Sequence, residues 1–482
     1  MLERFFCFIT IIFWFNPIPI YSQEFIDIEF LRNYNRSELA AQVGNIAEYG
    51  VDVYKMRYAS PDLYGNMDTL SGLVAIPVAQ DLLFPLLIYS HGTVSSRFNV
   101  PSRLSAESLL PTVLSSTGYI VAAPDLLGLG DSKGIHPYLH AQSSALSSFD
   151  MIRAIKEYKE VHGIDVNEQL FITGYSQGGH TTMALHRYIQ ELNLQEYEIT
   201  AAAPMSGPYS MSIEMFEFTM GEKEYFFPGY LVAIILSFQE VYRDVFVLPG
   251  LEEIFKKEYL SDIEEYLNEV IDLSTLNNRL VTNVRNAHGR VLSKYMINDE
   301  IYEEIWTENQ HPFRLALADN DVYEWVPKAP TRLIYCRDDD QVVFTNSIRA
   351  DSVMRALGSQ DVFAVNGGND LDHGQCIPNA LTITYLFFRQ FQNVKSQSSY
   401  PEAQMFAWST YPNPANSRII LKLEDSTEEG KIYIYDMMGR CVYLGVYITG
   451  TEIIVDSLKT GKYVLHFQNE NKSITSKFFI VR

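Results

Sequence analysis

The chain has 482 residues, of which 47% are hydrophobic and 20% are charged, and its formal net charge at pH 7 is -22. This composition excludes a disordered or fibrous chain, and the length is sufficient for two or three globular domains. The negative charge excludes a nucleic-acid partner, because such proteins need a basic surface that displaces the counterions of the phosphates.

The first 22 residues have the pattern of a secretory signal peptide. Arg4 precedes an apolar run over residues 5–15, and two prolines then separate this run from polar residues. The run is too short to cross a bilayer. We therefore expect residues 1–22 to be removed, with cleavage near Ser22 or Gln23; the alternative is a buried N-terminal helix. No later run is apolar and long enough for a membrane span.

Predicted strands and helices alternate along the next part of the chain. An antiparallel hairpin is predicted for residues 51–76, with its turn at Tyr64-Gly65-Asn66. The strands and helices that follow predict a mostly parallel sheet with right-handed crossover connections. The predicted strands are 84–90, 119–124, 169–172, 199–204, 331–336 and 361–365, and the predicted helices are 104–116, 141–160, 181–186, 345–357 and a closing helix to about residue 392.

A glycine-rich turn, Gly174-Tyr175-Ser176-Gln177-Gly178, joins a predicted strand to a predicted helix. Such a turn strains the backbone of the serine and exposes its hydroxyl at the sheet edge, and no side chain would fit at Gly174 or Gly178. The pattern predicts a nucleophile elbow with Ser176 at its tip. The alternative is that the pattern arose by chance in a loop.

Residues from about 206 to 328 interrupt the alternation of strands and helices. They have helical spacing, few strand signals and many aromatic and methionine side chains. An insertion at this point lies over the carboxyl ends of the strands, where open α/β sheets bind ligands. We predict a helical lid whose apolar side chains line a pocket; the alternative is that these side chains only form the core of a helical subdomain.

A serine nucleophile needs an imidazole base, and the imidazole needs a carboxylate that fixes its tautomer. An acidic run, Asp338-Asp339-Asp340, follows one predicted strand, and His373 follows the next strand on a glycine-flanked loop. His466 is the only other histidine beyond the acidic run, and it lies in a strand predicted for a separate domain. We predict His373 as the base and Asp339 as the acid, with Asp338 and Asp340 as alternatives.

Together these motifs resemble those of secreted α/β-hydrolases of the lipase and esterase type, over about residues 51–392. The chain order Ser, Asp, His is that of this fold. The resemblance implies a mostly parallel sheet with helices on both faces, and cleavage of small-molecule or lipid esters through an acyl-enzyme on Ser176, without metal or cofactor. The motifs are His91-Gly92-Thr93, Asp125 to Ser132 with His136-Pro137-Tyr138, Gly174 to Gly179, and Leu371-Asp372-His373-Gly374.

The tetrahedral intermediate of ester cleavage needs hydrogen-bond donors for its oxyanion. In hydrolases of this fold one donor is the backbone N–H after the nucleophile, here Gln177, and another comes from the loop after the third strand, for which we predict Thr93. We expect His91, in the same loop, to pack or hydrogen-bond locally. The segment 125–132 is interpreted as a structural turn in which Asp125 bonds loop amides.

Two cysteines flank the predicted acid and base. Cys336 lies three residues before Asp339, where the family more often has glycine nearby, and Cys376 lies three residues after His373. The geometry of a triad brings these two loops side by side, and disulfides form in exported proteins. We therefore predict a disulfide between Cys336 and Cys376; the alternative is two buried free thiols.

The composition changes after Gln392, and residues 396–408 are predicted to form a polar linker. Short alternating strands follow and predict a small all-β sandwich. This segment resembles the C-terminal sorting domain of type IX secretion in Bacteroidetes-type bacteria. The matching residues are Tyr411 to Ala415, Ile434 to Arg440, Leu458 to Tyr463 and Lys477 to Val481.

The resemblance implies that the type IX machinery exports the protein through the periplasm to the outer-membrane surface or the medium. The predicted organisation is a signal peptide at 1–22, an α/β-hydrolase domain at 23–395 with its lid at about 206–328, a linker at 396–408 and a sorting domain at 409–482. The predicted function is ester cleavage by a secreted serine hydrolase. The alternatives are a serine peptidase of the same fold and a catalytically inactive surface-binding protein.

Overall fold

The computed structural model describes residues 24–162, 166–245 and 248–396, and in the C-terminal part residues 409–411, 415–422, 429–436, 441–447, 452–469, 473–480 and 482. The chain divides into two compact units at Lys395 and Ser396. The predicted signal peptide and nearly all of the predicted linker lie outside the described residues.

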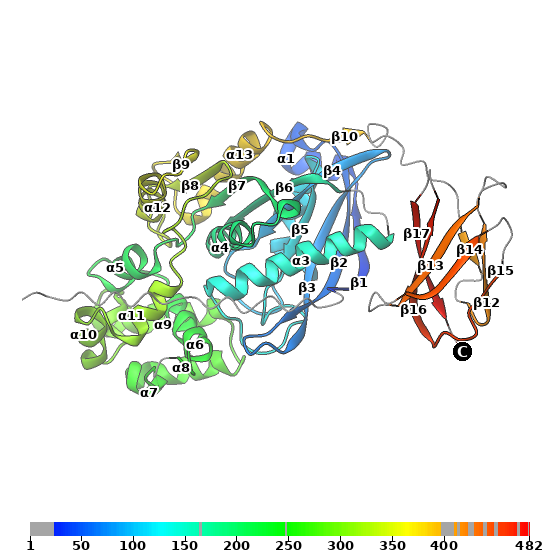
Figure 1. Cartoon of the computed structure of the whole chain (residues 1–482). Coiled ribbons are helices and arrows are strands. Elements are labelled where there is room, and N and C mark those ends of the chain that lie inside the picture. The colour runs from blue at the N-terminus through cyan, green and yellow to red at the C-terminus, as the bar shows by residue number, and fades with distance from the viewer. Residues whose placement is uncertain are drawn as a thin grey trace, which may run out of the picture. The chain divides into compact units, whose positions relative to one another are not determined.

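The first unit is built on a large sheet, shown in Figure 1. Its strands are β1 (Phe25–Tyr34), β2 (Gly50–Pro61), β3 (Met67–Val78), β4 (Leu82–Ser90), β5 (Ile120–Pro124), β6 (Val166–Tyr175), β7 (Ile199–Met205), β8 (Thr331–Cys336) and β9 (Val362–Gly368), and the short β10 (Lys395–Ser396) follows. The main path of the sheet is β1-β2-β3-β5-β4-β6-β7-β8-β9. Pairing is antiparallel from β1 to β5 and parallel from β5 to β9, which confirms the predicted mostly parallel sheet.

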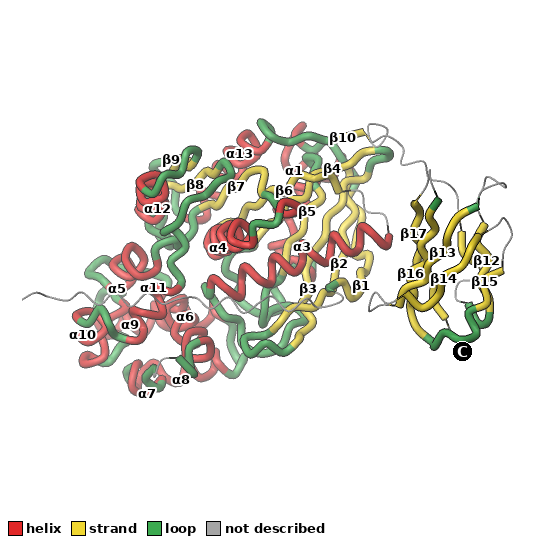
Figure 2. Tube along the Cα trace, in the orientation of Figure 1, coloured by secondary structure: helices red, strands yellow, loops and turns green. Residues whose placement is uncertain are grey.

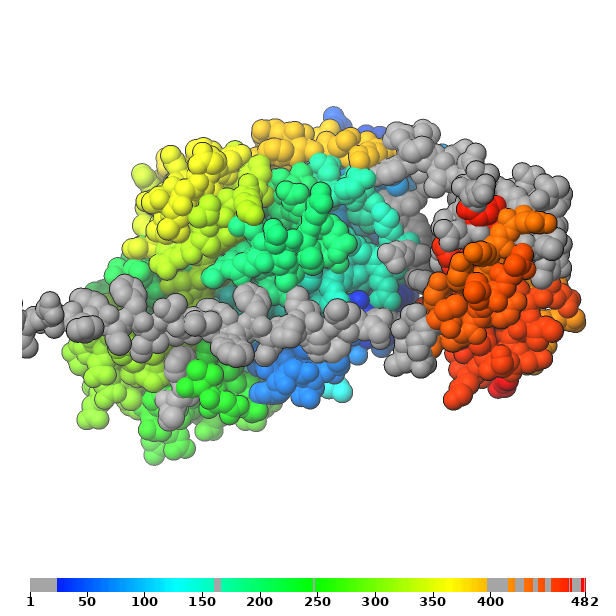
Figure 3. Space-filling model, in the orientation of Figure 1, coloured from blue at the N-terminus to red at the C-terminus, as the bar shows by residue number. Residues whose placement is uncertain are grey.

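Helices cover both faces of this sheet (Figure 2). In β4, Leu87 and Tyr89 belong to the apolar cluster that includes side chains of α1 (Arg36–Val43), α2 (Leu109–Ser116) and α13 (His373–Phe388). Leu86 and Ile88 belong instead to the cluster with α3 (Ala141–His162) and α4 (Gln177–Leu192), whose side chains cover the strands in Figure 3. Since alternate side chains of one strand enter both clusters, β4 is buried on both faces, as its continuous apolar run predicts.

Several elements differ from the sequence-based predictions, among them α4, which was predicted for residues 181–186 and spans Gln177–Leu192. The strand β1 was not predicted, because it is an edge strand with many exposed side chains and two register shifts, and it lacks a clear alternating pattern. The helix predicted for 104–116 begins only at Leu109, because Leu104 has a left-handed backbone with φ of 52° and short 3₁₀ turns precede the helix. The closing helix ends at Phe388 rather than near residue 392.

The segment between β7 and β8 is a helical lid, as predicted. Its α-helices are α5 (Phe216–Met220), α6 (Pro228–Val241), α7 (Leu251–Ile254), α8 (Lys257–Leu267), α9 (Leu273–His288), α10 (Asp299–Thr307) and α11 (Pro312–Asp319). They lie together beside the sheet in Figure 1 and share one apolar core. That core also contains Tyr138, Leu139 and Val342 from outside the lid. The lid therefore packs on loops of the hydrolase unit and does not form an isolated subdomain.

The second unit is a small β-sandwich, also as predicted. One sheet has the order β11-β12-β15 and the other has the order β14-β13-β16-β17. Alternating side chains such as Ile432 and Ile434 of the second sheet share a buried core with Ile419 and Ile453 of the first. The strands are β11 (Ser409–Tyr411), β12 (Arg418–Lys422), β13 (Gly430–Asp436), β14 (Cys441–Tyr447), β15 (Glu452–Ile454), β16 (Gly461–Gln468) and β17 (Ser473–Ile480).

The described part of the chain contains α12 (Thr345–Ala356) as its remaining α-helix, which packs near α4 through Met354 and Met183. Within that described part, no helix is both long enough and apolar enough to span a membrane.

Candidate active site

Ser176 stands between β6 and α4, at the tip of a sharp turn. Its backbone has φ of 59° and ψ of -122°, a conformation that non-glycine residues rarely adopt. Its N–H donates a hydrogen bond to the carbonyl oxygen of Met205 at 3.0 Å, which ties the turn to the end of β7. This is the strained strand-turn-helix geometry that the sequence predicts for a nucleophile elbow.

The glycines of the turn are required by close backbone approach. A Cβ at Gly174 would lie 2.4 Å from the carbonyl oxygen of Gly178, and a Cβ at Gly178 would lie 1.9 Å from the carbonyl oxygen of Ser90. Both distances are far below van der Waals contact, so neither position can hold a side chain. The same close packing presses α4 against the end of β4.

His373 and Asp339 meet at the carboxyl ends of β8 and β9. His373 Nδ1 lies 2.7 Å from Asp339 Oδ2, and both side chains are buried. Because the carboxylate can only accept, Nδ1 carries the proton and the opposite nitrogen, Nε2, is left as an acceptor. This is the tautomer that a general base for a serine hydroxyl requires.

The three neighbouring aspartates have different surroundings. Asp339 Oδ1 accepts hydrogen bonds from the backbone N–H groups of Gln341 and Val342, at 3.0 and 2.8 Å, so its carboxylate is held in place from both oxygens. Asp340 Oδ1 accepts instead from the backbone N–H of His373 at 3.1 Å. Asp338 is exposed. Among these three, Asp339 is therefore the one whose carboxylate contacts the imidazole.

Tyr175 links the elbow to the base. Its ring centroid lies 4.9 Å from that of His373, and its hydroxyl donates to the carbonyl oxygen of His373 at 2.6 Å. Burial raises the pKa of Tyr175, so the hydroxyl stays protonated and can donate. The residue before Ser176 thus holds the backbone of His373.

A disulfide joins Cys336 to Cys376 in the structure, with the two Cα atoms 5.9 Å apart. Cys336 ends β8, immediately before the acidic loop, and Cys376 lies in the first turn of α13, which begins with His373. Both cysteines are fully buried. The bridge therefore connects the loop of Asp339 to the helix that begins with His373.

The loop after β4 lies against Ser176. A Cβ at Gly92 would come within 3.8 Å of Ser176 Cβ, and the Oγ1 atom of the next residue, Thr93, lies 2.8 Å from the hydroxyl of Tyr138. Gln177 is the first residue of α4, where backbone N–H groups have no acceptor inside the helix. Both predicted oxyanion donors thus belong to segments that border Ser176.

The neighbouring polar residues have local roles. His91 is fully buried, and its ring nitrogens lie 2.7 and 3.1 Å from the carbonyl oxygens of Gly92 and Asp125. The Asp125 carboxylate accepts hydrogen bonds from the backbone N–H of Ser102 and from the hydroxyls of Ser102 and Ser71. These contacts agree with the structural turn expected at Asp125.

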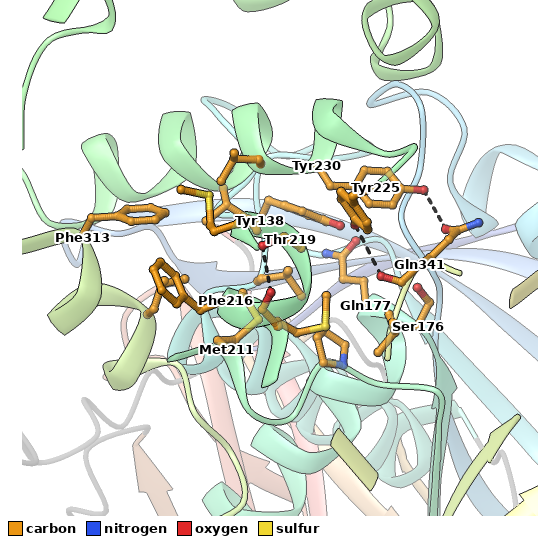
Figure 4. A pocket seen from close by; sticks show the side chains of 18 residues that line it. Tyr138, Ser176, Gln177, Met211, Phe216, Thr219, Tyr225, Tyr230, Phe313 and Gln341 are labelled. Carbon is orange, nitrogen blue, oxygen red and sulfur yellow. Dashed lines mark hydrogen bonds between the residues drawn. The ribbon is translucent and has the colours of Figure 1, made fainter. Parts of the chain in front are cut away.

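A cavity under the lid, here termed the lid pocket, reaches Ser176 (Figure 4). Its walls are mostly apolar. Two lid tyrosines bond one residue of the acid loop: Tyr225 donates to the carbonyl oxygen of Gln341 at 3.4 Å, and Tyr230 donates to Gln341 Oε1 at 3.1 Å. Residues that line the lid pocket include Tyr138, Leu139, Ser176, Gln177, Met211, Met215, Phe216, Thr219, Leu231, Ile234, Phe313 and Val342.

The structure brings the predicted Asp339 and His373 together, whereas several residues that shape the lid pocket were not predicted. Gln341 was assigned no role from the sequence, and its partners Tyr225 and Tyr230 lie more than a hundred positions away. His136 and Tyr138 were noted as part of a motif without a role. No local signal identifies these contacts, because they join segments that are far apart in the chain.

Within the described ranges, no group of three or more His, Cys, Asp or Glu side chains is arranged to hold a metal ion. Residues 409–481 match the family model of the secretion system C-terminal sorting domain, so this part of the chain is such a domain. No match to the chain is found among curated protein sequences.

Solved structures resemble the first unit. The rice cell wall degrading esterase LipA from Xanthomonas oryzae is 25% identical, with a TM-score of 0.67 over 76% of this chain and 99% of that chain. A presumed hydrolase of Legionella pneumophila is 25% identical, with a TM-score of 0.69 over 79% and 100%. Candida antarctica lipase A shares the fold at 15% identity, with a TM-score of 0.56 over 76% and 81%. The first unit therefore has the α/β-hydrolase fold found in esterases and lipases.

Proposed function

We propose that the protein is a serine hydrolase that cleaves carboxylic esters through an acyl-enzyme. The observation that carries this proposal is the buried hydrogen bond between His373 and Asp339 beside an elbow whose Ser176 lines the lid pocket. The 25% identity with the Xanthomonas oryzae esterase over nearly all of that chain supports the same reaction class. In this proposal Ser176 is the nucleophile, His373 the base and Asp339 the residue that orients the base.

Each proton has a defined path in the proposed reaction. His373 Nε2 takes the proton of the Ser176 hydroxyl while Oγ attacks the ester carbonyl, and the backbone N–H groups of Gln177 and Thr93 stabilise the oxyanion. When the intermediate collapses, the alcohol leaves with the proton held on His373. Water then gives a proton to His373 and attacks the acyl-enzyme, and when this second intermediate collapses His373 returns the proton to Ser176 Oγ as the acid leaves. Asp339 stabilises the imidazolium in both steps.

The lid pocket is proposed to bind the acyl group. Ser176 lines this pocket, and side chains such as Met211, Leu231 and Phe313 give it mainly apolar walls. Burial of an apolar chain against such walls contributes about 0.8 kcal/mol per methylene. We therefore expect esters with a longer aliphatic acyl chain to be hydrolysed better than acetate esters.

The substitution Ser176→Ala tests the proposed function. It removes the nucleophile, and we expect hydrolysis of p-nitrophenyl butyrate to fall by about 10⁴-fold or more while the thermal unfolding curve stays unchanged. The wild type should also bind a fluorophosphonate probe covalently, and the variant should not. Wild-type activity that survives this substitution would exclude Ser176 as the nucleophile.

The same assays separate the proposed function from its two alternatives. A serine peptidase of this fold would cleave aminoacyl-arylamides faster than the matched esters. A catalytically inactive binding protein would react with neither substrate and would not be labelled by the fluorophosphonate. Ester hydrolysis with labelling at Ser176 is the outcome that we expect.

We also propose that the protein is exported by the type IX machinery to the cell surface or the medium. The sorting domain at residues 409–481 supports this, and the N-terminal pattern supports a signal peptide over residues 1–22. N-terminal sequencing and intact mass of the exported protein should show cleavage near Ser22 or Gln23. An exported protein that retains residues 1–22 would contradict the signal peptide.

A further inference from the structure

The side chain of Gln177 has no role in the mechanism above, which uses only its backbone N–H. It is almost completely buried, with 2% of its surface exposed, and it lines the lid pocket next to Ser176 (Figure 4). Its amide nitrogen, Nε2, lies 2.8 Å from Nε2 of His136. This contact fixes the orientation of the amide.

The hydrogen bond at His136 Nδ1 determines which way the Gln177 amide faces, because it fixes the tautomer of the imidazole. His136 Nδ1 lies 2.8 Å from the carbonyl oxygen of Leu127, which can only accept, so Nδ1 carries the proton. Burial lowers the pKa of His136 to about 4, so the ring is neutral at neutral pH and its Nε2 accepts. Gln177 Nε2 is therefore the donor, because a flipped amide would place two acceptors in contact.

This orientation leaves the amide oxygen of Gln177 without a donor. Oε1 is buried and has no hydrogen-bond partner among the described residues. The tyrosine hydroxyls around the lid pocket are already engaged: Tyr138 with Thr93, and Tyr225 and Tyr230 with Gln341. A buried acceptor without a donor costs about 1–3 kcal/mol, so such an atom beside a nucleophile requires an explanation.

We infer that Gln177 is a specificity-determining residue whose Oε1 accepts a hydrogen bond from the acyl group of the substrate. The substrate class is then an ester whose acyl group carries a hydroxyl or an amide N–H close to the scissile carbonyl. This inference rests on the proposed function, since it concerns the acyl group that Ser176 attacks. His136 orients the Gln177 amide, and this gives the His136-Pro137-Tyr138 motif a role that the proposed mechanism does not assign to it.

The expected preference follows from the physics of an unpaired acceptor. A substrate that supplies the donor satisfies Oε1, whereas a substrate with a methyl group at the same place leaves Oε1 buried and unpaired. Apolar pocket walls alone would not favour the hydroxylated ester over the methyl ester, because a hydroxyl and a methyl group have nearly the same size. We expect kcat/KM to favour the hydroxylated ester by at least about tenfold, which corresponds to about 1.4 kcal/mol.

The experiment compares the folded full chain on two matched pairs of ethyl esters. The pairs are 2-hydroxybutanoate with 2-methylbutanoate, and 3-hydroxybutanoate with 3-methylbutanoate. In the wild type at least one hydroxy ester should exceed its methyl counterpart by about tenfold or more in kcat/KM. In Gln177→Met and Gln177→Leu that ratio should fall by about tenfold, whereas Gln190→Met, a matched change of a partly exposed glutamine on α4, should keep it.

The intrinsic reactivity of each ester is the same for the wild type and every variant. It therefore cancels when the ratio of kcat/KM values is compared between them. A ratio near one in the wild type for both pairs, with both esters hydrolysed, would overturn the inference and leave the proposed function standing. A high ratio that survives in both Gln177 variants would also overturn the inference. If the wild type hydrolyses no ester and the fluorophosphonate does not label Ser176, the proposed function itself fails and the inference fails with it.

Discussion

The two sides of the candidate active site are held together by different forces. On the side of the acid and base, a disulfide, the bond between Asp339 and His373, and the backbone contact of Asp340 with His373 connect two loops. On the side of the lid, apolar packing and the hydrogen bonds of Tyr225 and Tyr230 to one glutamine close the pocket. The first side is cross-linked and polar, and the second side is packed and apolar.

This difference separates two requirements of the proposed reaction. Proton transfer needs atoms held within a few tenths of an ångström, which directional and covalent bonds achieve. Selection of an acyl group needs a surface of adjustable shape, which packed side chains of methionine, leucine and phenylalanine supply. We therefore expect changes on the acid–base side to reduce kcat strongly, and changes on the lid side to alter KM and chain-length preference.

The largest effect is expected from Asp339→Asn. The amide cannot hold the imidazole in the tautomer with a proton on Nδ1, nor stabilise the imidazolium, so kcat should fall by about 10⁴-fold with little change in KM. Steady-state kinetics on p-nitrophenyl butyrate measure this effect. Asp340→Asn should cost only about threefold, because the amide oxygen can still accept from the N–H of His373, and the exposed Asp338→Asn should have no effect. Equal losses in all three variants would contradict the assignment.

An intermediate effect is expected from removal of the disulfide. The bridge spans 40 positions of sequence, and in Cys336→Ser with Cys376→Ser the free energy of unfolding should fall by about 2–4 kcal/mol. Denaturant unfolding measures the loss, and kcat should fall with it if the bridge also positions the base. The exposed Cys441→Ser serves as the control and should leave both unchanged. Alkylation of Cys336 and Cys376 in the unreduced wild type would show that no bridge exists.

The smallest effect is expected from Tyr230→Phe on the lid side. The change removes the hydroxyl that donates to Gln341 Oε1, and one such bond contributes about 0.5–1.5 kcal/mol. We expect KM for p-nitrophenyl butyrate to rise a few-fold while kcat stays within about twofold. The exposed Tyr64→Phe is the matched control and should leave KM unchanged. A large loss of kcat in Tyr230→Phe would mean that the two sides are not separate.

Much of the fold was predictable because its signals are local. The continuous apolar run of β4 predicts a strand buried on both faces, and the structure places its side chains in two separate clusters. The turn around Ser176 is recognisable because Gly174 and Gly178 sit where no Cβ fits. The edge strand β1 could not be predicted, because its exposed faces impose no hydrophobic pattern on the sequence.

The lid pocket was less predictable because its walls come from distant segments. Aromatic and methionine residues between β7 and β8 were consistent both with a pocket and with the core of a subdomain. The structure shows that both descriptions apply: Met211, Met215 and Phe216 line the pocket and belong to the lid core. Only the packing of the lid onto Tyr138 and Val342 decides which side chains face Ser176.

The sequence alone therefore determined most of the strands and helices along the chain, the elbow at Ser176 and the histidine that follows the last strand of the first unit, because each depends on residues adjacent in the chain. The tertiary structure decided which of three consecutive aspartates contacts His373, 34 positions away from Asp339. It also decided the contact between His136 and Gln177, 41 positions apart, which leaves one amide oxygen near Ser176 without a hydrogen-bond partner in the part of the chain that the structure describes. Hydrogen bonds between residues so far apart leave no periodic pattern in a sequence, and only the folded chain brings them together.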